Sequence, residues 1–142
     1  ASDVYKRQVS TDKTHIIVVD DSKMMLKLYQ NKLSALGFTP RTFDRPEDAI
    51  PEILETQPDL VITDLNMPNI SGLELTREIR KKFTRQQIPI LMITTQSDFI
   101  EEEKGDMRVD NTILTKSGIN LLLHKPFTDD DFKQAITRFL AP

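Results

Sequence analysis

The chain has 142 residues, of which 29% are charged and 38% hydrophobic, and its formal net charge is -3. This balance is typical of one soluble globular domain and excludes an intrinsically disordered chain. The mild negative charge argues against nucleic acid as a direct ligand, and the absence of cysteine excludes disulfides, thiolate catalysis and thiolate metal sites. No apolar run approaches the roughly 18 residues that span a bilayer, and no secretory pattern opens the chain, so we expect a cytoplasmic protein without a membrane partner.

The first elements can be assigned from the hydrophobic pattern. Residues 1–13 are polar and have no usable period, so we expect a flexible N-terminal tail ahead of one domain over residues 14–142. Residues 15–20 form an apolar run that ends on an acid, as expected for a strand buried on both faces. Ser22 can cap a helix that Gly37 closes. The apolar stripe of that helix is expected to comprise Met24, Met25, Leu28, Leu33 and Leu36.

Strands and helices then continue to alternate. Further strands are predicted at 38–43, 60–64, 89–95 and 121–124. Further helices are predicted to begin at Pro46, at Ser71 or Gly72, and at Asp129 or Asp130. The stretch 96–118 has no clear assignment. Because right-handed crossovers place helices on both faces of such a sheet, the pattern predicts a doubly wound α/β fold with five parallel strands.

Polar residues stand where four of these strands end. Asp20 and Asp21 end the first strand, Asp64 ends the third, Thr94 the fourth and Lys125 the fifth. The carboxyl ends of parallel strands meet at one edge of the sheet, where open α/β sheets build their sites. We therefore expect these five side chains to gather at that edge.

The chemistry of this group points to a cation and a phosphate. Three crowded carboxylates repel one another, and a hard divalent cation would relieve the repulsion. Mg²⁺ suits a site of carboxylates, a carbonyl and phosphate oxygens, whereas a zinc-type site is excluded. A lysine and a hydroxyl on the same edge indicate a ligand with a phosphate group. The pattern thus suggests Mg²⁺-assisted phosphoryl transfer with a carboxylate as the nucleophile.

Each of these features alone is more often structural. An Asp pair after a strand usually starts a turn and a helix, a lone Thr at a strand end usually packs, and Lys-Pro is usually a surface turn. The functional interpretation depends on all of them occurring in one chain, in this order.

With these motifs the chain resembles a response-regulator receiver domain of bacterial two-component signalling. The resemblance covers about 16–140 and implies a flavodoxin-like receiver fold with strand order 2-1-3-4-5. The matching motifs are Val19-Asp20-Asp21-Ser22, Asp64-Leu65-Asn66-Met67-Pro68 with Gly72, Thr94, and Lys125-Pro126-Phe127.

The resemblance also implies a role for each polar residue. Asp64 would be the phosphoacceptor. The carboxylates of Asp21 and Asp64 and the carbonyl of Asn66 would ligate Mg²⁺, with Asp20 acting mainly through bound water. The hydroxyl of Thr94 would hydrogen-bond the phosphoryl group.

Lys125 would pair with the phosphoryl oxygens, and a cis bond to Pro126 is expected to aim it inward. The implied function is a phosphorylation-dependent switch, which acts on itself and is no enzyme for a separate substrate. Its upstream partner would be a histidine kinase or phosphotransfer protein. A protein output partner would bind the face that runs from Gln96 to Phe127.

Two departures keep an alternative open. Leu122 stands where the family usually has an aromatic switch residue, and Thr95 is bulkier than the small residue common there. Both favour a binding module that works without phosphorylation, whereas the intact acids, Thr94 and Lys125 argue against it. A small Mg²⁺ phosphatase of another family is weaker, because it would want an acid where Asn66 stands.

A further departure is an unusually long connection before the last strand, with the excess in 97–112. Residues 97–110 contain six acids and two bases, a net charge of -4. The stretch is either a solvated surface loop or a partner-binding element.

Overall fold

The computed structural model describes residues 14–95 and 118–140. The predictions of a tail over 1–13 and of an acidic element within 97–112 concern residues outside these ranges. None of the described helices is long and apolar enough to cross a membrane.

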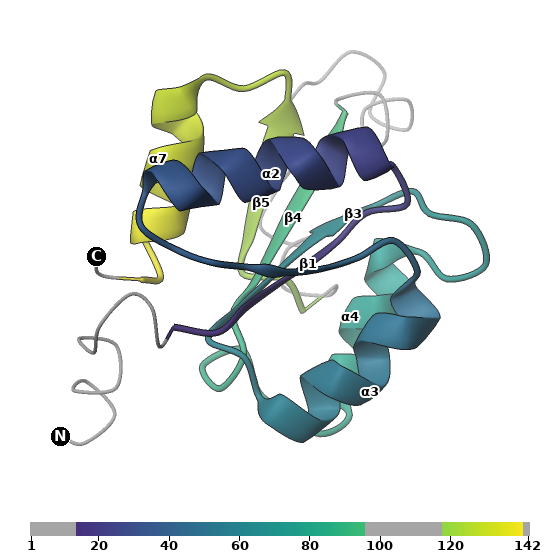
Figure 1. The fold of residues 1–142 in the computed structure, drawn as a ribbon. Helices are drawn as coiled ribbons and strands as arrows, with labels where there is room; N and C mark the ends of the chain where they lie inside the picture. Colours follow the sequence, from purple (N-terminus) through teal and green to yellow (C-terminus); the bar gives the residue numbers. More distant parts are fainter. Residues whose placement is uncertain (1–13, 96–117, 141–142) are drawn as a thin grey trace, which may run out of the picture.

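Five strands form one parallel sheet in the order β2-β1-β3-β4-β5, which confirms the predicted topology (Figure 1). Every neighbouring pair is parallel. Apart from β2, the strands are rich in Val, Ile and Leu, as expected where helices cover both faces of a sheet. They are β1 (Ile16–Val19), β2 (Arg41–Phe43), β3 (Leu60–Asp64), β4 (Ile90–Thr95) and β5 (Leu121–Lys125).

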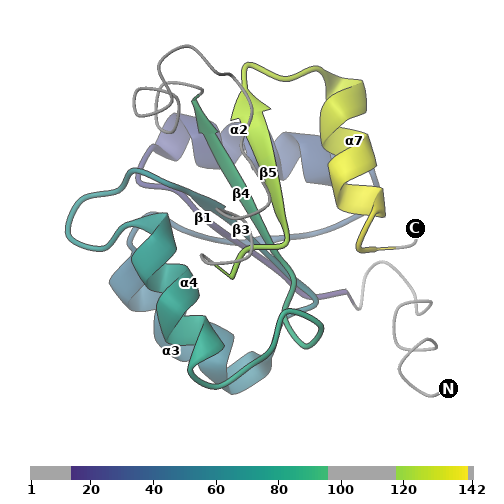
Figure 2. The same cartoon turned by 180° about the vertical axis from the view of Figure 1, so that it is seen from behind.

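Within the described residues, four helices lie against this sheet, two on each face (Figures 1 and 2). The apolar residues of α2 and α7 join one buried cluster with one face of the strands, and those of α3 and α4 join a second cluster on the other face. The sheet therefore separates two cores. The helices are α2 (Lys23–Ala35), α3 (Pro46–Thr56), α4 (Gly72–Arg80) and α7 (Asp129–Thr137).

Local caps explain where these helices begin and end. The hydroxyl of Ser22 accepts a hydrogen bond from the backbone N–H of Met25 at 3.2 Å, as predicted for the start of α2. Ser71 and Thr128 head reciprocal capping boxes on α4 and α7. Gly37, at φ 94°, adopts the left-handed backbone that follows the last turn of α2.

The predicted apolar stripe of α2 was partly wrong. Met24 is 79% exposed and Leu28 is 39% exposed, whereas Leu26, Tyr29 and Leu33 are buried. Five of the seven residues from Lys23 to Tyr29 are apolar or aromatic, so the sequence period does not select one face. Packing against the sheet and α7 makes that selection.

One strand is shorter than the predicted range 38–43. β2 covers only Arg41–Phe43 because Pro40, just before it, has no backbone N–H to donate. Phe38 instead packs in the buried cluster beneath α2. At the other face α4 ends at Arg80, so Phe83 packs against the second cluster from beyond the helix.

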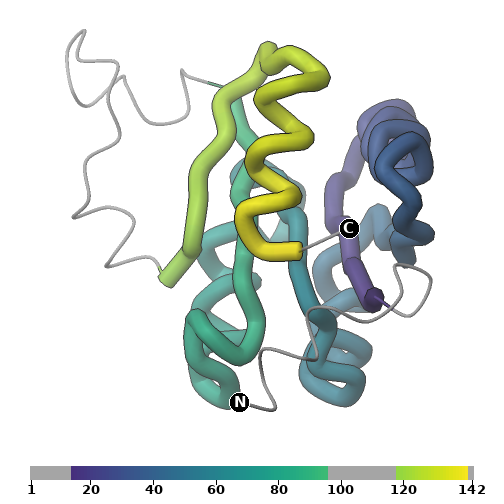
Figure 3. Tube along the Cα trace, turned by 90° about the vertical axis from the view of Figure 1, so that its left-hand side faces the viewer, coloured from purple at the N-terminus to yellow at the C-terminus, as the bar shows by residue number. Residues whose placement is uncertain are grey.

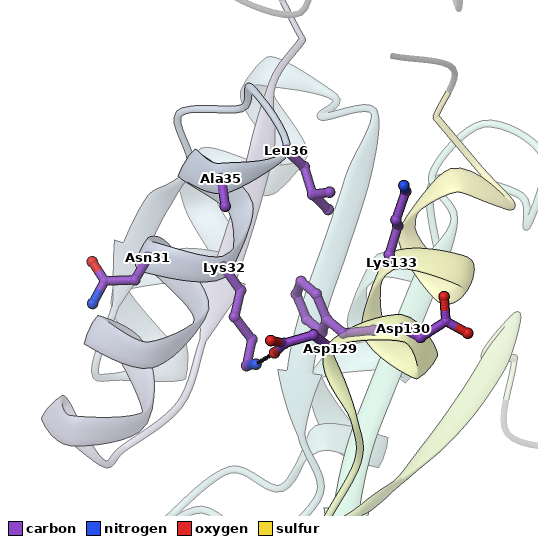
Figure 4. A pocket seen from close by; sticks show the side chains of 8 residues that line it. Asn31, Lys32, Ala35, Leu36, Asp129, Asp130 and Lys133 are labelled. Atoms are coloured by element: carbon purple, nitrogen blue, oxygen red, sulfur yellow. Dashed lines mark hydrogen bonds and ion pairs between the residues drawn. The ribbon is translucent and has the colours of Figure 1, made fainter.

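A stack of three aromatic rings joins α2 to α7. The ring centroid of Tyr29 lies 6.4 Å from that of Phe127 and 6.1 Å from that of Phe132, and the last two are 5.7 Å apart. Lys32 stands 5.7 Å from the centre of the Phe127 ring and pairs with Asp129. The side view in Figure 3 shows α7 beside β5, and Figure 4 shows Lys32 and Asp129 pointing towards each other at a surface pocket of about 530 Å³.

A second cross-link lies at the opposite end of the sheet, where the half-buried Arg80 clamps the chain that leads into β5. The pKa of Arg80 is lowered to about 10, mainly by burial and also by the charge of Arg85. All the hydrogen-bond acceptors that the guanidinium contacts among the described residues are neutral oxygens. It donates to the carbonyls of Gly118, Phe83, Thr84 and Ile88 and to the side-chain oxygen of Asn120.

Candidate functional site

Three carboxylates meet at the carboxyl edge of the sheet, as predicted. Each of Asp20, Asp21 and Asp64 offers an oxygen, and these oxygens lie within 4.8 Å of one another. The register explains the meeting, because β1 pairs Val19 with Thr63 on β3. The residues that follow this pair are Asp20 and Asp64, so two carboxylates leave adjacent strands side by side.

Asp20 is the buried member of the group, with only 1% of its surface exposed. Its backbone N–H donates to the carbonyl of Phe43 at 3.1 Å, which ties it to β2. Its Oδ1 accepts a hydrogen bond from the backbone N–H of Ser22 at 2.9 Å. Its Oδ2 is buried and has no hydrogen-bond partner among the described residues.

The pKa of Asp20 is raised to about 6, mainly by burial and also by the charges of Asp64 and Asp21, while the Ser22 hydrogen bond and Lys125 oppose the shift. A buried acid without a full set of partners is costly in its ionised form. A cation at Oδ2 would satisfy this oxygen and offset the repulsion. The oxygen-only set of ligands fits a hard divalent ion such as Mg²⁺.

Asp64 is held from two directions. Its Oδ1 accepts a hydrogen bond from the backbone N–H of Leu65 at 2.9 Å, and Lys125 Nζ lies 3.5 Å from the same oxygen. Lys125 reaches it from the end of β5, where the bond to Pro126 is cis, as the resemblance implied.

Gly72 lets α4 begin directly against this corner. Its backbone N–H donates to the carbonyl of Leu65 at 2.8 Å. A Cβ atom at position 72 would stand 2.2 Å from the backbone oxygen of Asp64, closer than real Cβ contacts come. Sequence reasoning noted Gly72 as a helix start and a motif residue but gave no reason for a glycine. The reason is this close approach of two backbones.

The other two predicted site residues, Asn66 and Thr94, lie near the cluster of three carboxylates. Asn66 is exposed in the loop that follows β3. Thr94 lies at the end of β4, one residue beyond Ile93, the partner of Asp64. Alternation along β4 places the Thr94 side chain with Met92, on the face covered by α3 and α4. Its hydroxyl is buried without a hydrogen-bond partner among the described residues.

The structure also shows where Leu122 and Thr95, the two departures from the family pattern, lie. Leu122 lies opposite Met92 and is partly buried against the second cluster, so it packs as an ordinary apolar residue. Thr95 is exposed at the end of β4 and lies opposite Lys125. Sequence reasoning overlooked His124, which β5 places opposite Thr94. The available signal was a polar ring two residues after Leu122 and therefore on the same face.

Sheet order and the cluster of acids with its lysine place the chain among receiver-type α/β domains. A family model described as the response regulator receiver domain matches residues 16–137, and the chain belongs to that family. This confirms the resemblance seen in the motifs. The chain is thus a receiver domain of the two-component type.

Known relatives include short and long proteins. The chain is 34% identical over 123 residues to chemotaxis protein CheY1 of Helicobacter pylori, covering 85% of this chain and 92% of that protein. It is 32% identical over 127 residues to sensor protein EvgS of Escherichia coli, covering 89% of this chain but 10% of that protein. The structure resembles that of a response regulator receiver domain protein from Clostridium thermocellum, with a TM-score of 0.74 and 26% identity over 89% of this chain and 94% of the other.

Proposed function

We propose that this domain is a phosphorylation-dependent signalling switch that accepts a phosphoryl group on Asp64. The observation that carries the proposal is the lysine at the acid cluster, with Lys125 Nζ 3.5 Å from Asp64 Oδ1. Carboxylates alone would hold a cation. Here a positively charged lysine also stands beside the nucleophilic carboxylate. This supports a reaction in which the carboxylate accepts a negatively charged group such as a phosphoryl group.

Asp21 and Asp64 would hold Mg²⁺ through their carboxylates, Asn66 through its backbone carbonyl, and Asp20 mainly through bound water. The unsatisfied Oδ2 of Asp20 supports this assignment. When bound, the ion supplies positive charge to the phosphoryl oxygens and offsets the repulsion among the carboxylates.

The transfer itself is a substitution at phosphorus. A carboxylate oxygen of Asp64 forms a bond to phosphorus, and the bond from phosphorus to the donor breaks, leaving its electron pair on the donor. The N–H of Leu65 fixes the orientation of the carboxylate. Lys125 offsets the charge of the phosphoryl group, and the hydroxyl of Thr94 donates to one of its oxygens.

The donor would be a histidine kinase or phosphotransfer protein, whose phosphorylated imidazole supplies the group. The domain acts on itself in this scheme, and its location would be cytoplasmic. Its output would pass to a protein on the face that runs from Gln96 to Phe127. The described part of that range, residues 118–127, comprises the segment that leads into β5, β5 itself and the start of the loop before α7.

Mass spectrometry after incubation with acetyl phosphate tests the proposal. We expect one phosphoryl group per chain, dependent on Mg²⁺ and abolished by Asp64→Asn. Asp44→Asn is the matched control, because Asp44 follows β2 at the same edge of the sheet but stands outside the acid cluster. A phosphoryl group that persists in Asp64→Asn would show that the acceptor is another residue.

One observation favours a second candidate, a protein-binding module that works without phosphorylation. Leu122 is packed opposite Met92 and has no polar tip with which to signal. In that case a partner would bind wild type and Asp64→Asn equally, and beryllofluoride, a phosphoryl mimic, would leave the affinity unchanged.

A further inference from the structure

Thr94 and His124 stand opposite each other at the ends of two neighbouring strands. The register of β4 and β5 pairs them directly (Figure 2 shows the two strands side by side). Their side chains lie on the same face of the sheet, because Met92 and Leu122, two residues earlier on each strand, both contact the cluster beneath α3 and α4. Neighbouring strands are about 4.8 Å apart, so a hydroxyl and an imidazole at paired positions are within reach of each other.

Both side chains carry a buried polar atom that lacks a partner. Thr94 Oγ1 and His124 Nδ1 are among the few buried side-chain atoms of the described residues without a hydrogen bond. Such atoms are uncommon in folded proteins, because leaving a buried polar group unpaired destabilises the fold. Two of them at one pair of positions indicate an interaction that forms in another state of the domain.

The chemistry of the two groups defines that interaction. A threonine hydroxyl has one proton to donate and lone pairs to accept. If it donates its proton to a phosphoryl oxygen on Asp64, its oxygen remains available as an acceptor. A neutral imidazole with its proton on Nδ1 is a matching donor.

We propose that His124 reads the phosphorylation state of Asp64 by donating a hydrogen bond from Nδ1–H to Thr94 Oγ1. The inference rests on the proposed function. It makes His124 the residue that responds when Thr94 binds the phosphoryl group. Leu122 cannot take this part because it lies opposite Met92 and has no hydrogen-bonding group. His124 acts as a positioning residue, because it touches the threonine and not the phosphoryl group.

The direct test follows the ring nitrogens of ¹⁵N-histidine by NMR. The chain has two histidines, and the other is an internal control. His15 precedes β1 at the opposite edge of the sheet, where its Nε2 lies 3.1 Å from Thr56 Oγ1. On addition of Mg²⁺ and beryllofluoride, we expect His124 Nδ1 to shift to the protonated nitrogen position, while the His15 signals stay in place.

Two variants separate a hydrogen-bonding role from a packing role. His124→Asn keeps an N–H donor close to the position of Nδ1 and should retain wild-type beryllofluoride affinity. His124→Leu keeps the bulk but not the donor, and we expect its affinity to fall about two- to tenfold, the loss of one hydrogen bond. Equal affinities for wild type and His124→Leu would overturn the proposal.

The outcomes also distinguish this inference from the function on which it rests. If wild type fails to gain a phosphoryl group by mass spectrometry, the proposed function fails. If Asp64 is phosphorylated but the nitrogens of His124 do not respond, only the role of His124 is wrong. The NMR measurement uses the wild-type chain, so it decides the question even if a variant does not fold.

Discussion

Lys125 Nζ lies 3.5 Å from Asp64 Oδ1, the oxygen that also accepts the N–H of Leu65 at 2.9 Å. One carboxylate oxygen thus faces a cation and an amide at once, which fixes the carboxylate in one orientation. Added charge at Asp64 is therefore stabilised from β5, a strand that pairs with β4 and not with β3.

Lys125→Ala should impair the response to a phosphoryl group more than its attachment. The carboxylates remain, so acetyl phosphate should still modify Asp64. What is lost is a charge-assisted contact of about 1.5–3 kcal/mol, so beryllofluoride affinity should fall roughly 10- to 150-fold in a titration. Lys23→Ala, which removes an exposed lysine 3.9 Å from Asp44, is the control. Wild-type affinity in Lys125→Ala would contradict the assigned role.

Asp20→Asn should stabilise the ion-free domain at alkaline pH. Because the folded-state pKa of Asp20 is raised from 3.8 to about 6, its ionised form destabilises the fold above pH 6, and this cost disappears as the pH falls towards 4. In urea unfolding at pH 8 without Mg²⁺, the variant should gain up to about 3 kcal/mol. At pH 4 the two proteins should be nearly equal, and a difference independent of pH would refute this account.

Gly72→Ala should destabilise the domain and disturb the acid cluster. A Cβ atom 2.2 Å from the Asp64 backbone oxygen forces α4 away from the end of β3. We expect a loss of about 3 kcal/mol in the free energy of unfolding. Ser71→Ala removes the neighbouring helix cap and should cost only about 1 kcal/mol. Equal losses for the two variants would mean that the corner relaxes without strain.

Arg80→Met should destabilise the domain by about 3 kcal/mol, because it removes the donors for several partly buried oxygens. Arg80→Lys should recover little, since an ammonium cannot reproduce the planar fork of the guanidinium. Arg77→Ala, on an exposed position of the same helix, should stay within about 0.5 kcal/mol of wild type. Chemical denaturation followed by circular dichroism measures the stability of all three variants. Wild-type stability in Arg80→Lys would contradict the claim that the planar guanidinium is needed.

The sequence predicted the acid cluster because each of its residues ends an apolar run. Asp20, Asp64 and Lys125 could be placed at one edge as soon as the strands were known to be parallel. The meeting of Asp20 and Asp64 needs no more than the β1–β3 register.

Features that depend on contacts between distant parts of the chain could not be predicted from the sequence. The face that α2 buries depends on Tyr29 stacking with rings that follow β5, and a local period cannot encode that. The pairing of Thr94 with His124 depends on the register between two strands far apart in the chain. The need for glycine at position 72 depends on the backbone of Asp64, which lies outside its helix.

The aromatic stack has a consequence for the integrity of the chain. Tyr29 belongs to the range 14–95, whereas Phe127 and Phe132 belong to the range 118–140. The stack and the β4–β5 ladder join these ranges without a covalent bond. We therefore expect that, if the chain is cleaved between these two ranges, the two peptides will associate by fragment complementation. Their association would place Lys125 beside Asp64 again. Fused to separate partners, the halves would report when those partners meet.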